Sequence, residues 1–144
     1  MHKTIIVALS ALAGATFAEA ATVKLAQDTY RIVDGDTIRL NKSGNYVRAI
    51  GYDTPEVRGK CEVEKEKATT ATARFTELTS PPNALTIRYA KGQDKYGRSL
   101  GYFYSNGKPI GPILISEGLA VPINLSTIRR GKVTHNWCFQ PSQN

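Results

Sequence analysis

The chain has 144 residues, and its 19 basic and 12 acidic side chains give a net charge of +7. This length allows one domain with a hydrophobic core, and the positive charge favours a polyanionic partner, of which nucleic acid is the commonest. Two cysteines cannot supply the four ligands of an ordinary zinc site, and the spacing of His135, Cys138 and the distant Cys61 matches no zinc motif.

The first twenty residues have the pattern of a signal peptide. A weakly basic start precedes an uncharged, mostly apolar stretch over residues 5–17, and Ala18-Glu19-Ala20 has the small–x–small form of a cleavage site. A membrane anchor is the alternative, but the apolar run is shorter than the roughly 20 residues that span a bilayer. We expect cleavage after Ala20 and one exported domain over residues 21–144. It should be extracellular or periplasmic, without stable membrane association, and a monomer.

Residues 22–52 predict three antiparallel strands in succession. The first is expected over residues 22–33, and Asp34-Gly35 is a strong hairpin signal. The second begins at Thr37, and Ser43-Gly44-Asn45 turns the chain into the third, over residues 46–50. The start of the second strand and the end of the third therefore lie at the same edge.

Residues 62–79 change to a helical period. Their apolar side chains fall on one face, at Ala68, Ala71, Phe75 and Leu78. The charged side chains of the first turns, residues 62–67, are expected to be mostly in solvent, and Pro81-Pro82 ends the helix.

Two more strands and a short helix complete the prediction. The strands are expected over residues 85–89 and 100–104, with a turn at Asn106-Gly107, and the helix from near Pro112 to Gly118. Five strands with one helix after the third and a short helix after the fifth suit an α+β protein, mainly β, with a five-stranded OB-type barrel.

The two cysteines indicate one disulfide, because an even number in an exported chain is usually paired. Two free thiols are the alternative. A bond between Cys61 and Cys138 would tie the C-terminal arm, residues 121–139, to the start of the long helix. The arm has few apolar anchors besides Trp137, so it needs such a tie.

Four acidic residues should converge at the shared edge of the three strands. They are Asp34, Asp36, Asp53 and Glu56. Converging carboxylates repel each other unless a cation lies between them, and oxygen ligands favour Ca²⁺ or Mg²⁺ over zinc. Taken singly, Asp34-Gly35 is better explained as a turn, and Asp53-Thr54-Pro55-Glu56 as a helix-start or loop signal.

Two arginines make a catalytic interpretation stronger. Arg48 lies in the otherwise apolar third strand, and Arg98 ends the segment 94–98. Cleavage of a phosphodiester needs fixed positive charge at the non-bridging oxygens, and the planar guanidinium suits that task. Glu56 is the natural candidate to hold or deprotonate water.

Three motifs in this order resemble the staphylococcal nuclease (thermonuclease-like) family. They are Asp34-Gly35-Asp36-Thr37, then Arg48 with Asp53-Thr54-Pro55-Glu56, then Asp94-Lys95-Tyr96-Gly97-Arg98. The resemblance runs from about residue 28 to residue 120. The motifs Gly59-Lys60-Cys61 and Trp137-Cys138 are similar to those of some bacterial relatives.

The resemblance implies a role for each matching residue. Ca²⁺ would be bound by Asp36, Asp53 and the carbonyl of Thr54, with Asp34 as a neighbouring carboxylate. Glu56 would contact the attacking water, and Arg48 and Arg98 would bind the scissile phosphate. Lys95 and Tyr96 match positions that contact a nucleotide phosphate.

The chain departs from the family's best-known member at its C-terminal end. Residues 121–125 replace a segment with tyrosines that can stack on a base, the long third helix is missing, and the loop after Asp53 is short. The sequence predicts a secreted, calcium-dependent endonuclease acting on DNA or RNA. The alternatives are a non-catalytic nucleic-acid-binding OB-fold domain and a secreted structural or inhibitor domain, but a pure binder gains nothing from four acids facing a polyanion.

Overall fold

A computed structural model describes residues 21–132 and 135–139, and the predicted signal peptide lies outside them. The strands are β1 (Thr22–Lys24), β2 (Tyr30–Ile32), β3 (Thr37–Leu40), β4 (Tyr46–Ala49), β5 (Gly51–Asp53), β6 (Leu85–Gln93), β7 (Ser99–Ser105), β8 (Lys108–Pro109) and β9 (Val121–Ile123). The helices are a short 3₁₀ turn, η1 (Gln27–Thr29), and α1 (Glu62–Thr79), α2 (Ile110–Ser116) and α3 (Leu125–Arg130).

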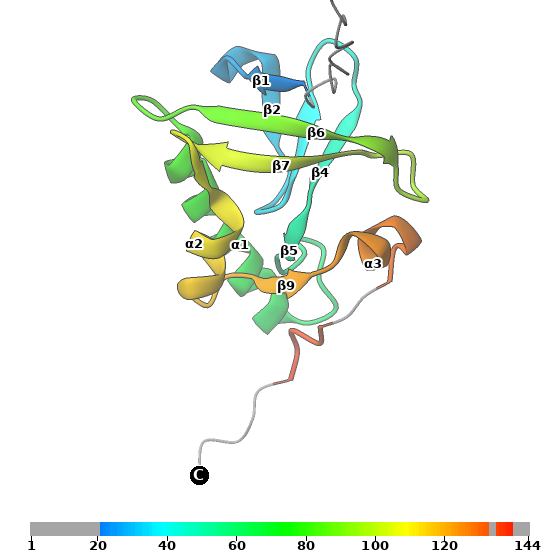
Figure 1. The fold of residues 1–144 in the computed structure, drawn as a ribbon. Helices are drawn as coiled ribbons and strands as arrows, with labels where there is room; N and C mark the ends of the chain where they lie inside the picture. Colours follow the sequence, from blue (N-terminus) through cyan, green and yellow to red (C-terminus); the bar gives the residue numbers. More distant parts are fainter. Residues whose placement is uncertain (1–20, 133–134, 140–144) are drawn as a thin grey trace, which may run out of the picture.

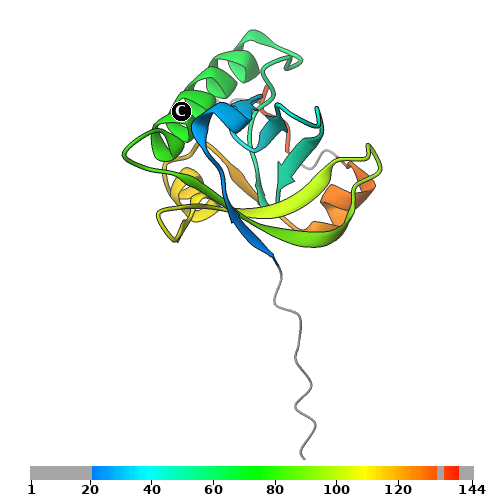
Figure 2. The same ribbon diagram turned by 90° about the horizontal axis from the view of Figure 1, so that it is seen from above.

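Most strands belong to one curled, mixed sheet in the order β1-β6-β7-β4-β3-β2, with β8 attached to β7. The β4–β7 pair is parallel, and the other pairs are antiparallel. A separate antiparallel pair joins β5 to β9, so the strand after β4 finds its partner near the C-terminal end. Figures 1 and 2 show the strongly curved sheet, with α1 and α2 together and α3 apart from them.

The main core lies between the curled sheet and the helices α1 and α2. Its fully buried members include Ile38 and Leu85 from the sheet and Leu114 from α2. Phe75 of α1 packs against Phe103 of β7, with 5.9 Å between ring centroids. This core holds the sheet in its curled form, and the predicted α+β fold of the OB type is confirmed.

A second, smaller cluster lies under α3. It joins Ile50, Leu100 and Ile128, all nearly inaccessible to solvent. Asn124 is the N-cap of α3, and its side chain accepts a hydrogen bond from the N–H of Thr127 at 2.9 Å. This helix was not predicted, and its Ile128 gives the C-terminal arm an apolar anchor besides Trp137.

Several predicted elements agree closely with the structure. The long helix has the predicted bounds, and the three antiparallel strands β2, β3 and β4 follow one another as expected. The predicted first strand is wrong in one respect: residues 22–33 form two strands separated by η1, because β1 pairs with β6 and β2 pairs with β3. The short helix begins at Ile110 rather than near Pro112.

The structure contains the disulfide between Cys61 and Cys138, with their Cα atoms 6.0 Å apart. It joins the residue before α1 to the C-terminal arm and closes a sequence separation of 77 residues. Within the described ranges, no helix has both the length and the apolar character needed to cross a membrane.

Candidate active site

The bend between β4 and β5 brings Arg48 and Asp53 together. Gly51 lies in the bend with a φ of +95°, a conformation that side chains with a Cβ rarely adopt. The Arg48 guanidinium fills the inside of the bend. Its Nη1 donates to the carbonyls of Ala49 and Tyr52 at 2.8 and 3.0 Å, and its Nη2 donates to Asp53 Oδ1 at 2.6 Å.

Asp36 meets the same guanidinium from the neighbouring strand. It directly precedes β3, and its Oδ2 lies 3.2 Å from Nη2 of Arg48. The Thr54 N–H and hydroxyl both donate to this oxygen, at 2.8 and 3.0 Å. Asp36, Arg48 and Thr54 are each at most 4% exposed. The predicted convergence at this edge is therefore present for Asp36 and Asp53.

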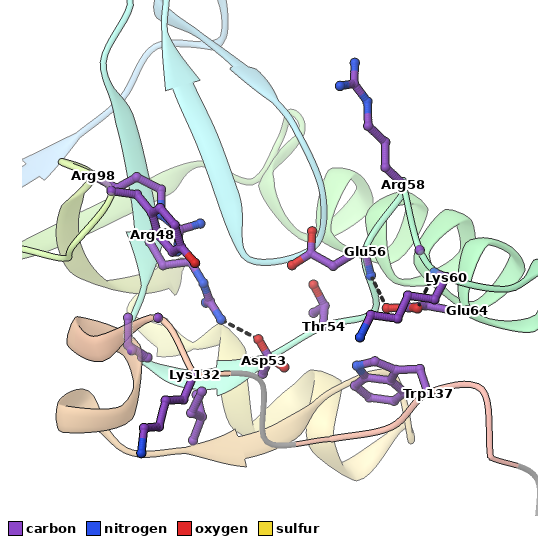
Figure 3. Close-up of a pocket in the computed structure, with 15 residues that line it drawn as sticks. Arg48, Asp53, Thr54, Glu56, Arg58, Lys60, Glu64, Arg98, Lys132 and Trp137 are labelled. Atoms are coloured by element: carbon purple, nitrogen blue, oxygen red, sulfur yellow. Dashed lines mark hydrogen bonds and ion pairs between the residues drawn. The ribbon is translucent and has the colours of Figure 1, made fainter.

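Asp34 and Glu56 lie near this centre, since the charge of Glu56 acts on Asp34 and the charges of Asp36 and Asp53 act on Glu56. Asp34 is buried in the hairpin turn and accepts a hydrogen bond from the N–H of Asp36 at 3.1 Å. The Tyr52 hydroxyl donates to the Gly35 carbonyl at 3.0 Å, which ties β5 to the same turn. Glu56 follows Thr54 in the segment between β5 and α1, and its side chain points into the pocket (Figure 3).

The turn between β6 and β7 supplies Arg98. Asp94 organises this turn: its Oδ1 accepts the N–H groups of Tyr96 and Arg98, and its Oδ2 accepts Arg98 Nε at 2.7 Å. The exposed Tyr96 ring lies under two cations, with Lys95 Nζ 4.9 Å and Arg98 Cζ 5.4 Å from its centroid. The Lys95 N–H donates to the Arg129 carbonyl at 3.0 Å, so α3 supports the turn.

These residues surround a pocket of about 340 Å³. In Figure 3, Arg48 and Arg98 lie on one side of the pocket, Lys60, Glu64 and Trp137 lie on the other, and Asp53, Thr54 and Glu56 lie between them. Six predicted site residues thus line one cavity: Arg48, Asp53, Thr54, Glu56, Tyr96 and Arg98. Asp34, Asp36 and Lys95 are not among its lining residues, although Asp36 contacts Arg48 and Thr54.

The pKa values at this site are shifted because several acidic side chains are buried close together. Burial, followed by the charges of Asp36 and Glu56, raises the pKa of Asp34 to about 9. Burial and the Asp36 charge raise the pKa of Asp53 to about 6, against the opposing effect of Arg48. Burial also raises the pKa of Glu56. Burial lowers the pKa of Arg48, but the charges of Asp36 and Asp53 outweigh that effect and raise it.

This donor set fits a hard divalent cation. Every candidate ligand atom is an oxygen, the preference of Ca²⁺ and Mg²⁺. Asp36 and Asp53 already meet at one nitrogen of Arg48, so they are placed to meet at one cation. The two carboxylates bring two negative charges against the one positive charge of Arg48. A bound cation would relieve that repulsion.

Sequence reasoning missed part of the pocket. Arg58, Lys60 and Lys132 add positive charge around it, although the Arg58 side chain points away from the other lining residues in Figure 3. Glu64 was expected in solvent with its neighbours on α1, and this was wrong: it is 7% exposed. The signal for Glu64 was its place three residues after Cys61, the cap of α1, where a carboxylate commonly turns back towards the preceding backbone.

Comparison with known proteins shows similarity to nucleases. The family of staphylococcal nuclease homologues matches residues 46–141. The SPbeta prophage-derived endonuclease YokF of Bacillus subtilis (strain 168) is 39% identical over 94 residues, which is 62% of this chain and 31% of that protein. The endonuclease YncB of the same strain is 37% identical, with 62% and 44% covered. The thermonuclease of Staphylococcus intermedius is 36% identical over 93 residues, with 62% and 55% covered.

The chain thus spans between about a third and a half of the length of these curated relatives. The matched region contains Arg48, Asp53, Glu56 and Arg98, and it covers well over half of the chain. The match agrees with the fold and contains the second and third motifs identified in the sequence, whereas Asp34-Gly35-Asp36-Thr37 precedes it. The chain belongs to the staphylococcal nuclease family.

Proposed function

We propose that this chain is an exported, calcium-dependent endonuclease that hydrolyses phosphodiester bonds in DNA or RNA. The observation that carries the proposal is the meeting of Asp36 and Asp53 at one buried arginine, Arg48, in a pocket that also holds Glu56 and Arg98. The endonuclease and thermonuclease names of the relatives support the same activity.

Asp36 and Asp53 would hold the calcium ion, with the Thr54 carbonyl as a third oxygen. When bound, the ion supplies positive charge beside the phosphate that is cut. Arg98 is held at the pocket by Asp94 and can donate to a non-bridging phosphate oxygen. Arg48 is held in a fixed orientation by two backbone carbonyls and lines the same pocket as Arg98, so it would add a second fixed positive charge beside the phosphate.

Glu56 would take the proton of the attacking water or orient it. Among the described residues, the pocket carboxylates Glu56 and Glu64 both lack an ion pair to an arginine or lysine, but the Glu64 oxygens already accept backbone N–H groups. Asp53 is paired with Arg48 and Asp94 with Arg98. Glu56 therefore keeps its oxygens available for water, as a general base requires.

Export and calcium use are parts of the proposal that rest on sequence and donor chemistry. The signal-peptide pattern of residues 1–20 supports export. Outside the cell, a calcium site with an affinity of roughly 10⁻⁴–10⁻³ M suffices, as in other extracellular modules.

Cleavage assays with the exported protein test the proposal. Plasmid DNA, single-stranded DNA and RNA are each incubated with calcium, with magnesium and with excess chelator. Cleavage in calcium that stops in chelator is expected, and full cleavage in chelator would refute the metal requirement. Binding without cleavage under every condition would instead support the alternative, a non-catalytic nucleic-acid-binding domain.

A further inference from the structure

Glu64 is a buried carboxylate that the proposed reaction does not use. It lies in the first turn of α1, and among the described residues no lysine or arginine forms an ion pair with it. Its oxygens instead accept two backbone N–H groups. Oε2 accepts Lys60 N–H at 2.8 Å, and Oε1 accepts Glu56 N–H at 3.4 Å. One carboxylate thus holds both ends of the segment 56–60.

The segment 56–60 is folded closely around the Glu64 side chain. A Cβ atom at Gly59 would lie 2.5 Å from Cγ and 2.6 Å from Cδ of Glu64, so a residue larger than glycine does not fit without displacement. The Gly59 N–H donates to the Glu56 carbonyl at 2.8 Å and closes a tight turn. The backbone that carries Glu56 therefore takes its shape from Glu64.

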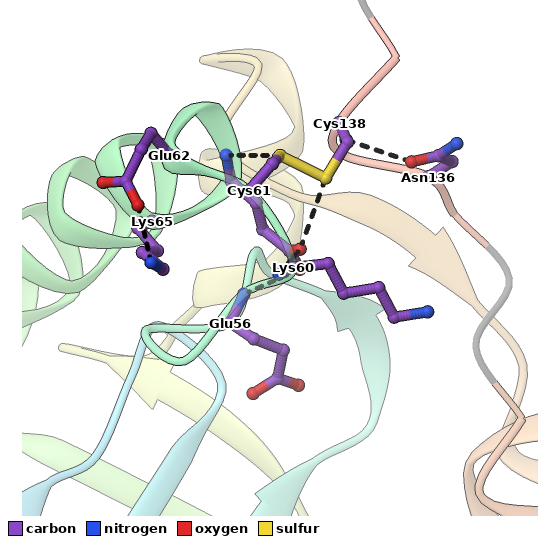
Figure 4. The surroundings of a disulfide bond; sticks show 8 residues. Glu56, Lys60, Cys61, Glu62, Lys65, Asn136 and Cys138 are labelled. Carbon is purple, nitrogen blue, oxygen red and sulfur yellow. Dashed lines mark hydrogen bonds and ion pairs between the residues drawn. A yellow bond between two sulfur atoms is a disulfide. The ribbon is translucent and has the colours of Figure 1, made fainter.

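The disulfide holds Glu64 from the other side. Cys61 is the N-cap residue of α1, and its sulfur lies 3.4 Å from the Glu64 nitrogen. The Cys138 sulfur lies 3.9 Å from Glu64 Oε2. A disulfide sulfur carries no proton, so this second approach is a packing contact. Figure 4 shows the bond beside the start of α1 and the backbone of the segment 56–60.

We propose that Glu64 is a positioning residue for Glu56, fixed in place by the Cys61–Cys138 bond. The inference rests on the proposed function, because it gives Glu64 a task in setting the proposed base. Glu64 acts through the backbone of the segment 56–60. Asp36 and Arg48 lie on the sheet, where their contacts do not involve Glu64. Loss of Glu64 should therefore affect turnover rather than the binding of calcium or substrate.

The test uses Glu64→Ala, which removes both acceptors, and Glu64→Gln, which keeps one. The matched control is Glu66→Gln, the same chemical change on an exposed position of the same helix. We measure kcat, KM and the calcium concentration for half-maximal rate. We also measure hydrogen exchange at the Lys60 and Gly59 amides, with the Ala49 amide as a reporter on the sheet, since it donates to the Asp36 carbonyl at 2.8 Å.

Glu64→Ala should lower kcat by at least about 10-fold and leave KM and the calcium requirement within about 2-fold. Exchange at Lys60 and Gly59 should become at least about 10-fold faster, with Ala49 unchanged. The kcat and exchange rates of Glu64→Gln should lie between those of Glu64→Ala and wild type, and those of Glu66→Gln should match wild type. If Glu64→Ala does not fold, Glu64→Gln decides alone: faster exchange at Lys60 or Gly59 together with reduced kcat supports the inference.

Two results would overturn the inference. The first is unchanged exchange in the segment 56–60 of folded Glu64 variants. The second is faster exchange there without a loss of kcat. If wild-type protein cleaves no substrate, the proposed function fails. The exchange data then still show whether Glu64 holds the segment, so the two failures are distinguishable.

Discussion

Removing the disulfide should release the C-terminal arm while the sheet keeps its fold. The double variant Cys61→Ser, Cys138→Ser breaks the bond and leaves a good N-cap residue at position 61. Trp137 lies next to Cys138, is 6% exposed and is the single tryptophan of the chain. Its fluorescence therefore reports on the arm alone.

The expected loss in unfolding free energy follows from the length of the loop that the disulfide closes. For a separation of 77 residues, loop-closure entropy gives an upper value of about 4–5 kcal/mol for the loss in unfolding free energy. At roughly 3–5 °C per kcal/mol for a domain of this size, this upper value corresponds to a fall in melting temperature of about 12–25 °C.

Thermal unfolding followed by far-UV circular dichroism measures that shift, and tryptophan emission at 25 °C measures the arm. The double variant should show red-shifted emission with an unchanged circular dichroism spectrum. Reduced wild-type protein is the control and should behave like the variant, whereas the variant itself should not respond to reductant. A fall of less than about 3 °C with unchanged emission would refute the reasoning, because packing of the arm would then suffice to hold it.

Three further predictions concern the pocket and the core. Calcium at 100 times its Kd should stabilise wild-type protein by about 2.7 kcal/mol in thermal unfolding, and Asp53→Asn should abolish that gain; equal stabilisation of both proteins would place the ion elsewhere. Glu56→Gln and Arg48→Lys should each lower kcat by at least about 10²-fold in a steady-state cleavage assay, and near-wild-type rates in folded protein would show that the site is misassigned. Phe75→Ala should cost about 3–5 kcal/mol in urea unfolding, because Phe75 is fully buried and packs on Phe103; a cost under about 1 kcal/mol would contradict the packing.

The sequence was sufficient to predict helices, strands and turns where several local signals agree. Helix α1 has its predicted bounds because its apolar residues repeat with the helical period and Pro81-Pro82 follows it. The Asp34-Gly35 turn and the strands beside it were equally clear. The acidic and arginine motifs also predicted the main residues that line the pocket.

The features that were missed depend on contacts between distant segments. Nothing local shows that residues 22–24 pair with β6 while residues 30–32 pair with β3. Helix α3 is too short for its apolar residues to show a period, and its place depends on Ile128 packing against Leu100. Glu64 resembled its solvated neighbours on α1. It is buried because the segment 56–60 and the disulfide close over it.

Pairing of β5 with β9 also limits the order in which parts of the chain can fold. Asp53 pairs with Val121, 68 positions later in the chain. Contacts over such separations form slowly, since a long stretch of chain must first be brought back on itself. A nascent chain therefore carries its acidic and arginine side chains well before it has an assembled pocket. The late residues Ile123, Ile128 and Trp137 also line the pocket, so the pocket stays incomplete until they have been synthesised.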